Sequence, residues 1–278
     1  MLILALESSC DETAAAVVSV DGAERMTVLS SIVASQIDVH RLYGGVVPEI
    51  ASRAHVEAIS RISEEALSVA GVGRDDIDLI AVTDHPGLIG ALLIAVNFAK
   101  ALALSWGKPL VGVDHIRGHI AAAYLTDSET PAPKPPFLAL AVSGGHTSIY
   151  HVTDYTSFRV IGETRDDAIG EAFDKIGRII GLPYPAGAAF DKLAAEGFCA
   201  ACGKETTDFL TYSKTDVAKD PAYRLPSPAL AGDTLDFSFS GLKTAAINLL
   251  HRHKMKGEEI DRALFAARYT YEAVEAVA

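Results

Sequence analysis

The chain has 278 residues, of which 49% are hydrophobic and 22% are charged, a balance typical of a folded globular protein. Its formal charge of −12 excludes a protein that coats nucleic acid by bulk electrostatics, so any RNA contact needs a local basic patch or a partner. Three cysteines are too few for a disulfide framework, and the first residues lack the basic start of a signal peptide, so we expect a cytoplasmic protein.

The first half of the chain alternates between predicted strands and helices. In chain order these are strands at 2–6 and 14–20, a helix at 46–71, a strand at 78–83, a helix at 87–106, a strand at 109–113 and a helix around His115. This alternation predicts a largely parallel sheet covered by helices. The helix at 87–106 is the most apolar, but it contains Asn97 and Lys100, so we expect a buried helix rather than a membrane span.

The pattern restarts after a proline-rich segment at 128–136, which has four prolines in nine residues. Residues 137–152 repeat the order of apolar strand, small-residue turn and strand with which the chain begins. We therefore expect an N-terminal lobe at 1–127, a linker at 128–136 and a C-terminal lobe at 137–278. Two related lobes predict the α/β architecture of actin, hexokinase and Hsp70, with duplicated RNase H-like lobes and nucleotide phosphates bound between them.

His115 and His119 lie four residues apart on a predicted helix, so both rings can face one point. The spacing suits a divalent metal, but it also suits two solvated histidines, and the residues alone leave both interpretations open. Asp114 is a poor third ligand, because adjacent residues on a helix point about 100° apart. A metalloprotease needs glutamate directly after the first histidine, where this chain has Ile116, and we exclude that class.

A second candidate site is the Ser-Gly-Gly turn at 143–145, where glycines let a phosphate approach and successive N–H groups can bind an anion. Many such turns bind nothing. Cys199 and Cys202 form half of a zinc knuckle without a second pair, so we expect no zinc there. The basic run at 251–256 is expected to be solvated.

Seven motifs together resemble the TsaD family, also called Gcp or YgjD, which are bacterial relatives of the archaeal and eukaryotic Kae-type proteins. They follow the family's order and cover nearly the whole chain: ESSCDET (7–13), YGGVVPEIASRAH (43–55), PGLIGALL (86–93), DHIRGH (114–119), VSGGHT (142–147), GEAFDKIGRIIGLPYPAG (170–187) and FSFSGLKTA (237–245).

This resemblance implies transfer of a threonylcarbamoyl group from threonylcarbamoyl-adenylate to the exocyclic amine of the adenosine beside the anticodon. The implied substrates are tRNAs that read codons beginning with A. It also implies partner proteins of the same pathway, TsaB and TsaE, and no membrane.

The resemblance further implies that His115 and His119 bind a divalent metal, iron(II) or alternatively zinc. It assigns no residue as acid, base or nucleophile. Acidic residues on the two helices after the turn would hold the ribose hydroxyls. The implied adenylate site comprises Ala141, Val142, Ser143, Gly144, Gly145, Asp174, Gly187 and Asp191.

The family's third metal ligand, an aspartate, and a nucleotide-binding asparagine follow a helix that resembles the last residues of this chain. We therefore expect both to be absent, the second lobe to be incomplete and metal binding through two histidines to be weak. Smaller departures from the family pattern are Asp84, His85, Arg117 and Ala186, none of which removes an implied ligand. Asp11 and Glu12, in the first turn, are placed where they could orient water or the metal shell, but we favour the interpretation that they have no role.

Two alternatives stay open. One is a carbamoyltransferase of the same fold that acts on another acceptor, because such enzymes share the histidine pair. The other is a non-catalytic scaffold that binds nucleotide and partner proteins.

Overall fold

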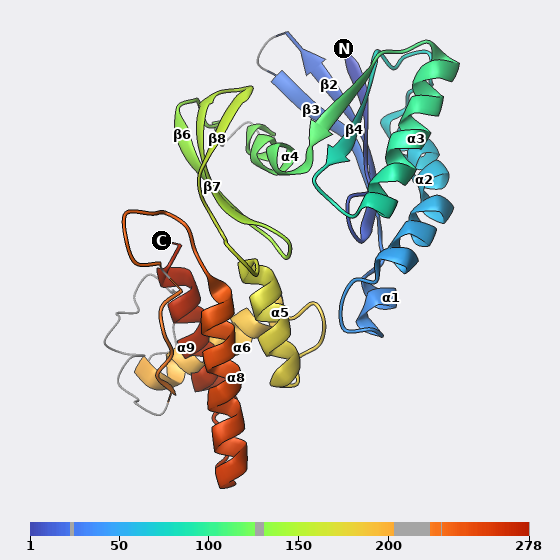
Figure 1. Cartoon of the computed structure of the whole chain (residues 1–278). Coiled ribbons are helices and arrows are strands. Elements are labelled where there is room, and N and C mark those ends of the chain that lie inside the picture. The colour runs from blue at the N-terminus through green and yellow to red at the C-terminus, as the bar shows by residue number, and fades with distance from the viewer. Residues whose placement is uncertain (23–24, 126–130, 203–222, 229, 278) are drawn as a thin grey trace. The chain divides into compact units, whose positions relative to one another are not determined.

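The computed structural model describes residues 1–22, 25–125, 131–202, 223–228 and 230–277 (Figure 1). The chain divides into two compact units, Met1–Pro135 and Pro136–Ala278, each with its own sheet and its own hydrophobic core. The boundary lies at the end of the proline-rich segment, of which residues 128–130 are outside the described residues.

The N-terminal unit is built on a five-stranded sheet in the order β3-β2-β1-β4-β5. Its strands are β1 (Leu2–Glu7), β2 (Glu12–Asp21), β3 (Arg25–Ser35), β4 (Leu79–His85) and β5 (Leu110–Asp114). β1, β4 and β5 are parallel, as expected, but β1–β2 and β2–β3 are antiparallel, so the prediction of a largely parallel sheet is wrong for half of the pairings. The turn at 8–11 is too short for the crossover that parallel strands require.

Strand β3 was not predicted from the sequence. It lies at the edge of the sheet, and Met26, Val28 and Val33 on it are exposed. A strand that leaves apolar residues in solvent lacks the alternation by which strands are recognised in a sequence.

The helices of the N-terminal unit are α1 (Ile37–Arg41), α2 (Pro48–Ala70), α3 (Ile89–Trp106), α4 (His115–Ala121) and the short 3-10 helix η1 (Ala122–Tyr124). Gly71 ends α2 in a left-handed conformation, φ 69°, as the sequence predicted. Ile59 and Ile62 of α2 pack with Leu4, Val17 and Ile80 of the sheet in the unit's core.

α3 buries a narrow stripe of small residues rather than its whole surface. The buried residues are four alanines spaced four apart, at 91, 95, 99 and 103, whereas Leu93 is 51% and Leu104 87% exposed. The prediction of a buried helix is therefore wrong for the opposite face. Among the described helices, α3 has the length and apolar composition of a membrane span, and 22% of its 18 residues are buried in the fold.

The C-terminal unit contains a three-stranded antiparallel sheet in the order β6-β7-β8 and a group of helices at one end of it (Figure 1). Its elements are β6 (Phe137–Val142), β7 (Thr147–Asp154), β8 (Ser157–Glu163), α5 (Ile169–Ile179), α6 (Gly187–Cys202), α8 (Phe239–Lys256) and α9 (Arg262–Glu275). The predicted strand, turn and strand at 137–152 is confirmed as the β6–β7 hairpin. Phe190, Phe239, Phe265 and Tyr269 form the aromatic centre of the helical core.

Two neighbouring aspartates connect the start of α5 with the start of α8. Asp166 accepts hydrogen bonds from the N–H groups of Phe239 and Ser240, at 2.9 and 3.1 Å, and from the Ser238 hydroxyl, so it caps α8 from another segment. Asp167 forms ion pairs with Lys175 of α5, at 2.9 Å, and with Lys243 of α8. The FSFSGLKTA motif is thereby held against the loop that precedes α5.

Asp166→Asn should lower the free energy of unfolding by about 0.5 kcal/mol at pH 7, because the amide loses the negative charge that is favourable at the start of α8. Burial raises the pKa of Asp166, but hydrogen bonds from Ser238, Ser240 and Phe239 outweigh burial and lower it. A lowered pKa in the folded state stabilises the fold above the unfolded-state value of about 3.9, and this stabilisation is lost as the pH falls through the folded-state pKa. The difference in the free energy of unfolding between variant and parent, measured by urea unfolding, should therefore be smaller at pH 2 than at pH 7.

The control for this measurement is Asp75→Asn, whose side chain is 93% exposed. A loss for Asp75→Asn as large as that for Asp166→Asn would contradict the assignment of Asp166 as a helix cap.

Candidate metal centre and nucleotide-binding segment

The histidine pair is positioned by the junction between β5 and α4. β5 ends at Asp114, whose carboxylate accepts a hydrogen bond from the Arg117 N–H at 2.9 Å and so caps the helix that begins at His115. His119 follows one turn later and faces the same side. The local sequence thus places both rings at the carboxyl edge of the parallel strands.

The two rings present nitrogen atoms to each other. The Nε2 atoms of His115 and His119 are 3.0 Å apart, and the rings meet edge to face with centroids 4.4 Å apart. Two nitrogens bound to one metal at about 2.0–2.1 Å are separated by about 3 Å when they occupy neighbouring positions, so the pair fits a divalent cation. Among the described residues, no group of three His, Cys, Asp or Glu side chains is arranged to hold a metal.

Glu7 and Ser9 hold the other side of the His115 ring. His115 Nδ1 lies 3.1 Å from Glu7 Oε2 and 3.2 Å from Ser9 Oγ. Because a carboxylate only accepts, Nδ1 carries the proton and Nε2 keeps its lone pair toward His119. This is the carboxylate–histidine arrangement that commonly supports a metal ligand.

The charges at this site favour a cation. Burial raises the pKa of Glu7, but hydrogen bonds from His115, Ser9 and Thr83 outweigh it and lower the pKa to about 2, so Glu7 is ionised. Burial and the neighbouring His115 lower the pKa of His119, which favours its neutral, metal-binding form.

Sequence reasoning missed Glu7 and considered Asp11 and Glu12 instead. Glu7 is separated from His115 by 108 positions, and only the parallel pairing of β1, β4 and β5 brings its strand end to the start of α4. The sequence signal that could have identified Glu7 is its position as the last residue of a strand before a small-residue turn.

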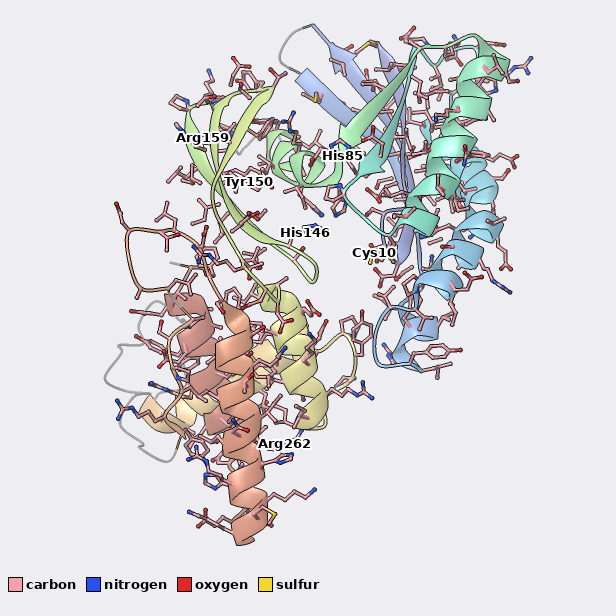
Figure 2. All side chains as sticks on the ribbon, in the orientation of Figure 1. Cys10, His85, His146, Tyr150, Arg159 and Arg262 are labelled. Carbon is pink, nitrogen blue, oxygen red and sulfur yellow. The ribbon has the colours of Figure 1, made fainter. Side chains whose placement is uncertain are left out.

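His85, one of the departures, lies beside the same helix start (Figure 2). His85 Nδ1 contacts the Asp84 carboxylate, and His85 Nε2 lies 3.4 Å from Asp114 Oδ2. His85 therefore contacts the capping residue of α4 rather than joining the His115–His119 pair.

In the C-terminal unit, the predicted phosphate segment is the β6–β7 turn, at which Figure 2 labels His146. Ser143 Oγ accepts hydrogen bonds from the N–H groups of Gly145 and His146, at 3.3 and 3.0 Å. A Cβ atom at Gly144 or Gly145 would meet no atom within 4 Å, and neither glycine has a positive φ. The two glycines thus leave open space beside the turn. Their backbone conformation does not itself require glycine.

The remaining predicted adenylate residues follow this turn along α5 and α6. The Gly170 N–H donates to the Ser143 carbonyl at 3.3 Å, and Asp174 lies one helical turn further along α5. Asp174 Oδ1 accepts the Ala186 N–H at 2.7 Å, directly before Gly187 begins α6. Asp191, one turn into α6, is exposed, as is Val142, whereas Ala141 is half-buried.

Comparison with known proteins gives a consistent family signal. Residues 27–278 match the family TsaD, described as tRNA N6-adenosine threonylcarbamoyltransferase. A protein of that name from Clostridium perfringens (strain 13 / Type A) is 53% identical over 274 residues, which are 99% of this chain and 73% of the relative. Another from Clostridium botulinum (strain Hall / ATCC 3502 / NCTC 13319 / Type A) is 50% identical over 273 residues, covering 98% of this chain and 72% of the relative.

Similarity to solved structures is weaker. YeaZ from Pseudomonas aeruginosa reaches a TM-score of 0.38 at 18% identity, over 58% of this chain and 68% of that chain. A Ppx/GppA family member from Aquifex aeolicus also reaches 0.38, at 10% identity, over 100% of this chain and 90% of that chain. Scores of this size support no conclusion about the site.

Glu7→Gln should weaken Zn²⁺ binding by about 10–100-fold, because the amide no longer holds the Nδ1 proton of His115 with a full negative charge. Isothermal calorimetry with Zn²⁺ alone measures this. Glu12→Gln, an exposed change at the other end of the same turn, is the matched control and should bind like the parent. Equal losses in the two variants would show that general surface charge, and not the Glu7–His115 hydrogen bond, sets the affinity.

Gly144→Val should abolish binding of adenine nucleotide without destabilising the fold, because the added side chain enters open space where the phosphate is expected. Calorimetry with AMP, together with a thermal melt, tests both parts. Gly45→Val, which also meets nothing within 4 Å, is the control. A Gly144→Val variant that binds AMP as well as the parent would remove the turn from the phosphate site.

Proposed function

Because this chain belongs to the TsaD family of tRNA N6-adenosine threonylcarbamoyltransferases, we propose that it transfers a threonylcarbamoyl group from threonylcarbamoyl-adenylate to tRNA. The acceptor is the exocyclic amine of the adenosine beside the anticodon, in tRNAs that read codons beginning with A. The amine nitrogen attacks the carbamoyl carbonyl carbon, the bond from that carbon to the phosphate oxygen breaks, AMP leaves and the amine loses a proton.

The observation that carries this proposal is the histidine pair with its carboxylate support. His115 and His119 present Nε2 atoms 3.0 Å apart, and Glu7 holds the opposite nitrogen of His115. These residues would hold a divalent metal, iron(II) or zinc, which supplies a Lewis acid for carbonyl or phosphate oxygens. His115 is kept by Glu7 and Ser9 in the tautomer that offers a lone pair.

The C-terminal unit supplies the groups for the adenylate. The open turn at 143–145 receives the phosphate. The N–H groups of Gly145 and His146, which donate to Ser143 Oγ in this structure, donate to the anion when it is bound. Asp174 and Asp191 hold the ribose hydroxyls, as acidic residues do in other nucleotide sites. Asp174 also orders residues 186–187 through the Ala186 N–H. No described residue is assigned as a proton acceptor.

The reaction also involves tRNA and the pathway proteins TsaB and TsaE. A chain with a charge of −12 does not hold tRNA by bulk electrostatics, which supports a role for partners in recruiting it. The exposed apolar face of α3, with Ile89, Leu93 and Leu104, is a surface on which a partner protein can dock.

His115→Ala and His119→Ala should each lower the transfer of labelled threonine into tRNA at least about 100-fold, since losing a metal ligand removes several kcal/mol of transition-state stabilisation. The assay supplies tRNA, TsaB, TsaE, ATP, bicarbonate and labelled threonine. The control His151→Ala alters a histidine on β7 that lies opposite Leu138 of β6 and is not one of the candidate site residues, and it should retain parental transfer.

The same assay separates the alternatives. Adenylate consumption without label in tRNA indicates another acceptor. Nucleotide binding without any transfer, and with no effect of His115→Ala, indicates a non-catalytic scaffold.

A further inference from the structure

Two histidines of the N-terminal unit are fully buried and take no part in the proposed metal pair. His40 lies in α1 and His55 in α2, and neither side chain reaches solvent. Buried histidines need partners for both ring nitrogens, so their contacts indicate which segments they hold together.

His55 contacts the end of the β1–β2 turn that leads into β2. His55 Nε2 lies 3.0 Å from the Cys10 carbonyl oxygen, and His55 Nδ1 lies 2.7 Å from Thr13 Oγ1. A carbonyl only accepts, so Nε2 carries the proton and Nδ1 accepts the threonine hydroxyl. Burial, the largest influence, lowers the pKa of His55, which keeps the ring neutral in this arrangement.

His40 supports the same turn through Gln36. The Val47 N–H donates to His40 Nδ1 at 3.3 Å, so His40 Nε2 donates to Gln36 Oε1 at 3.1 Å. The backbone N–H of Gln36 in turn donates to the Asp11 carbonyl at 3.0 Å. The turn is therefore held at both Cys10 and Asp11 by the segment that contains α1 and α2.

The other end of this turn carries the residues that hold His115. Glu7 and Ser9 contact His115 Nδ1, and the Ser9 carbonyl accepts the Leu88 N–H at 2.8 Å. A Cβ atom at Gly87 would lie 2.6 Å from that carbonyl, so the two backbone segments approach closely at Ser9. Because Cys10 directly follows Ser9, a displacement of Cys10 moves Ser9 and, through the turn, Glu7.

We propose that His55 is a positioning residue of the metal centre: by holding the Cys10 carbonyl it fixes Glu7 and Ser9 against His115, so that His115 Nε2 stays directed at His119. This inference rests on the proposed function only in taking His115 as a ligand. The orientation of the His115 ring is itself measurable without metal, tRNA or partners.

The test compares two substitutions at one position. Gln places its amide nitrogen near the position of His Nε2 and can still donate to Cys10, whereas Asn is one bond shorter and loses that donor. In the metal-free protein, ring ¹⁵N shifts report the His115 tautomer. His55→Asn should reduce the Nδ1–H tautomer and weaken Zn²⁺ binding about tenfold or more, and His55→Gln should restore both.

Ser63→Ala is the matched control, because Ser63 is buried on the same helix and its hydroxyl donates to the Ile59 carbonyl of that helix, at 2.7 Å. It should change neither the tautomer nor the Zn²⁺ affinity. If His55→Asn does not fold, Thr13→Val removes the Nδ1 partner instead and should give the same shift in tautomer.

A folded His55→Asn or Thr13→Val protein with parental His115 shifts and parental Zn²⁺ affinity would overturn the inference. That result would leave the transferase proposal intact. Conversely, an altered tautomer in a protein whose parent transfers no threonine would support His55 as a positioning residue and remove the proposed function.

Discussion

The hydrogen bond between Glu7 and His115 Nδ1 is the contact on which the candidate metal centre depends. A histidine pair four residues apart on a helix is otherwise ambiguous, because each ring can rotate and change tautomer. A charged acceptor behind one ring removes that freedom and directs a lone pair at the space shared with His119. Glu7 itself stays ionised because donors from His115, Ser9 and Thr83 outweigh the penalty of burial. The proposed metal pair is thus oriented by a residue that is not one of its two proposed ligands.

In both units a turn of the candidate site is held by the same arrangement. In the N-terminal unit the Ser9 carbonyl receives an N–H from Leu88, and a Cβ atom at Gly87 would come within 2.6 Å of it. In the C-terminal unit the Ser143 carbonyl receives the Gly170 N–H, and a Cβ atom at Gly170 would also come within 2.6 Å. In each case a glycine at a helix start lets the turn approach closely. These glycines are needed for close approach, and neither has a positive φ.

His85 and Ala186, which the resemblance marks as departures from the family pattern, lie beside the candidate sites. His85 contacts Asp84 and Asp114, so it lies next to the capping residue of α4. A Cβ atom on Gly177 of α5 would come within 2.4 Å of the methyl group of Ala186, which directly precedes α6. The close approach of α5 and the start of α6 therefore depends on a small residue at both positions. The local packing therefore accommodates both changes.

The sequence by itself determined the α/β class, the restart of the pattern after the proline-rich segment and the pairing of His115 with His119. These follow from local periodicity, from turn chemistry and from one helical repeat, which need only neighbouring residues. The tertiary structure alone decided that Glu7 supports His115, that β3 joins the sheet antiparallel and that α3 leaves a large apolar face exposed. Each of these depends on which distant segments meet, and Glu7 and His115 are brought together across 108 positions by strand pairing that no local pattern encodes. The burial of α3 likewise depends on how much of its surface the sheet and α2 cover, and hydropathy along the chain does not contain that information.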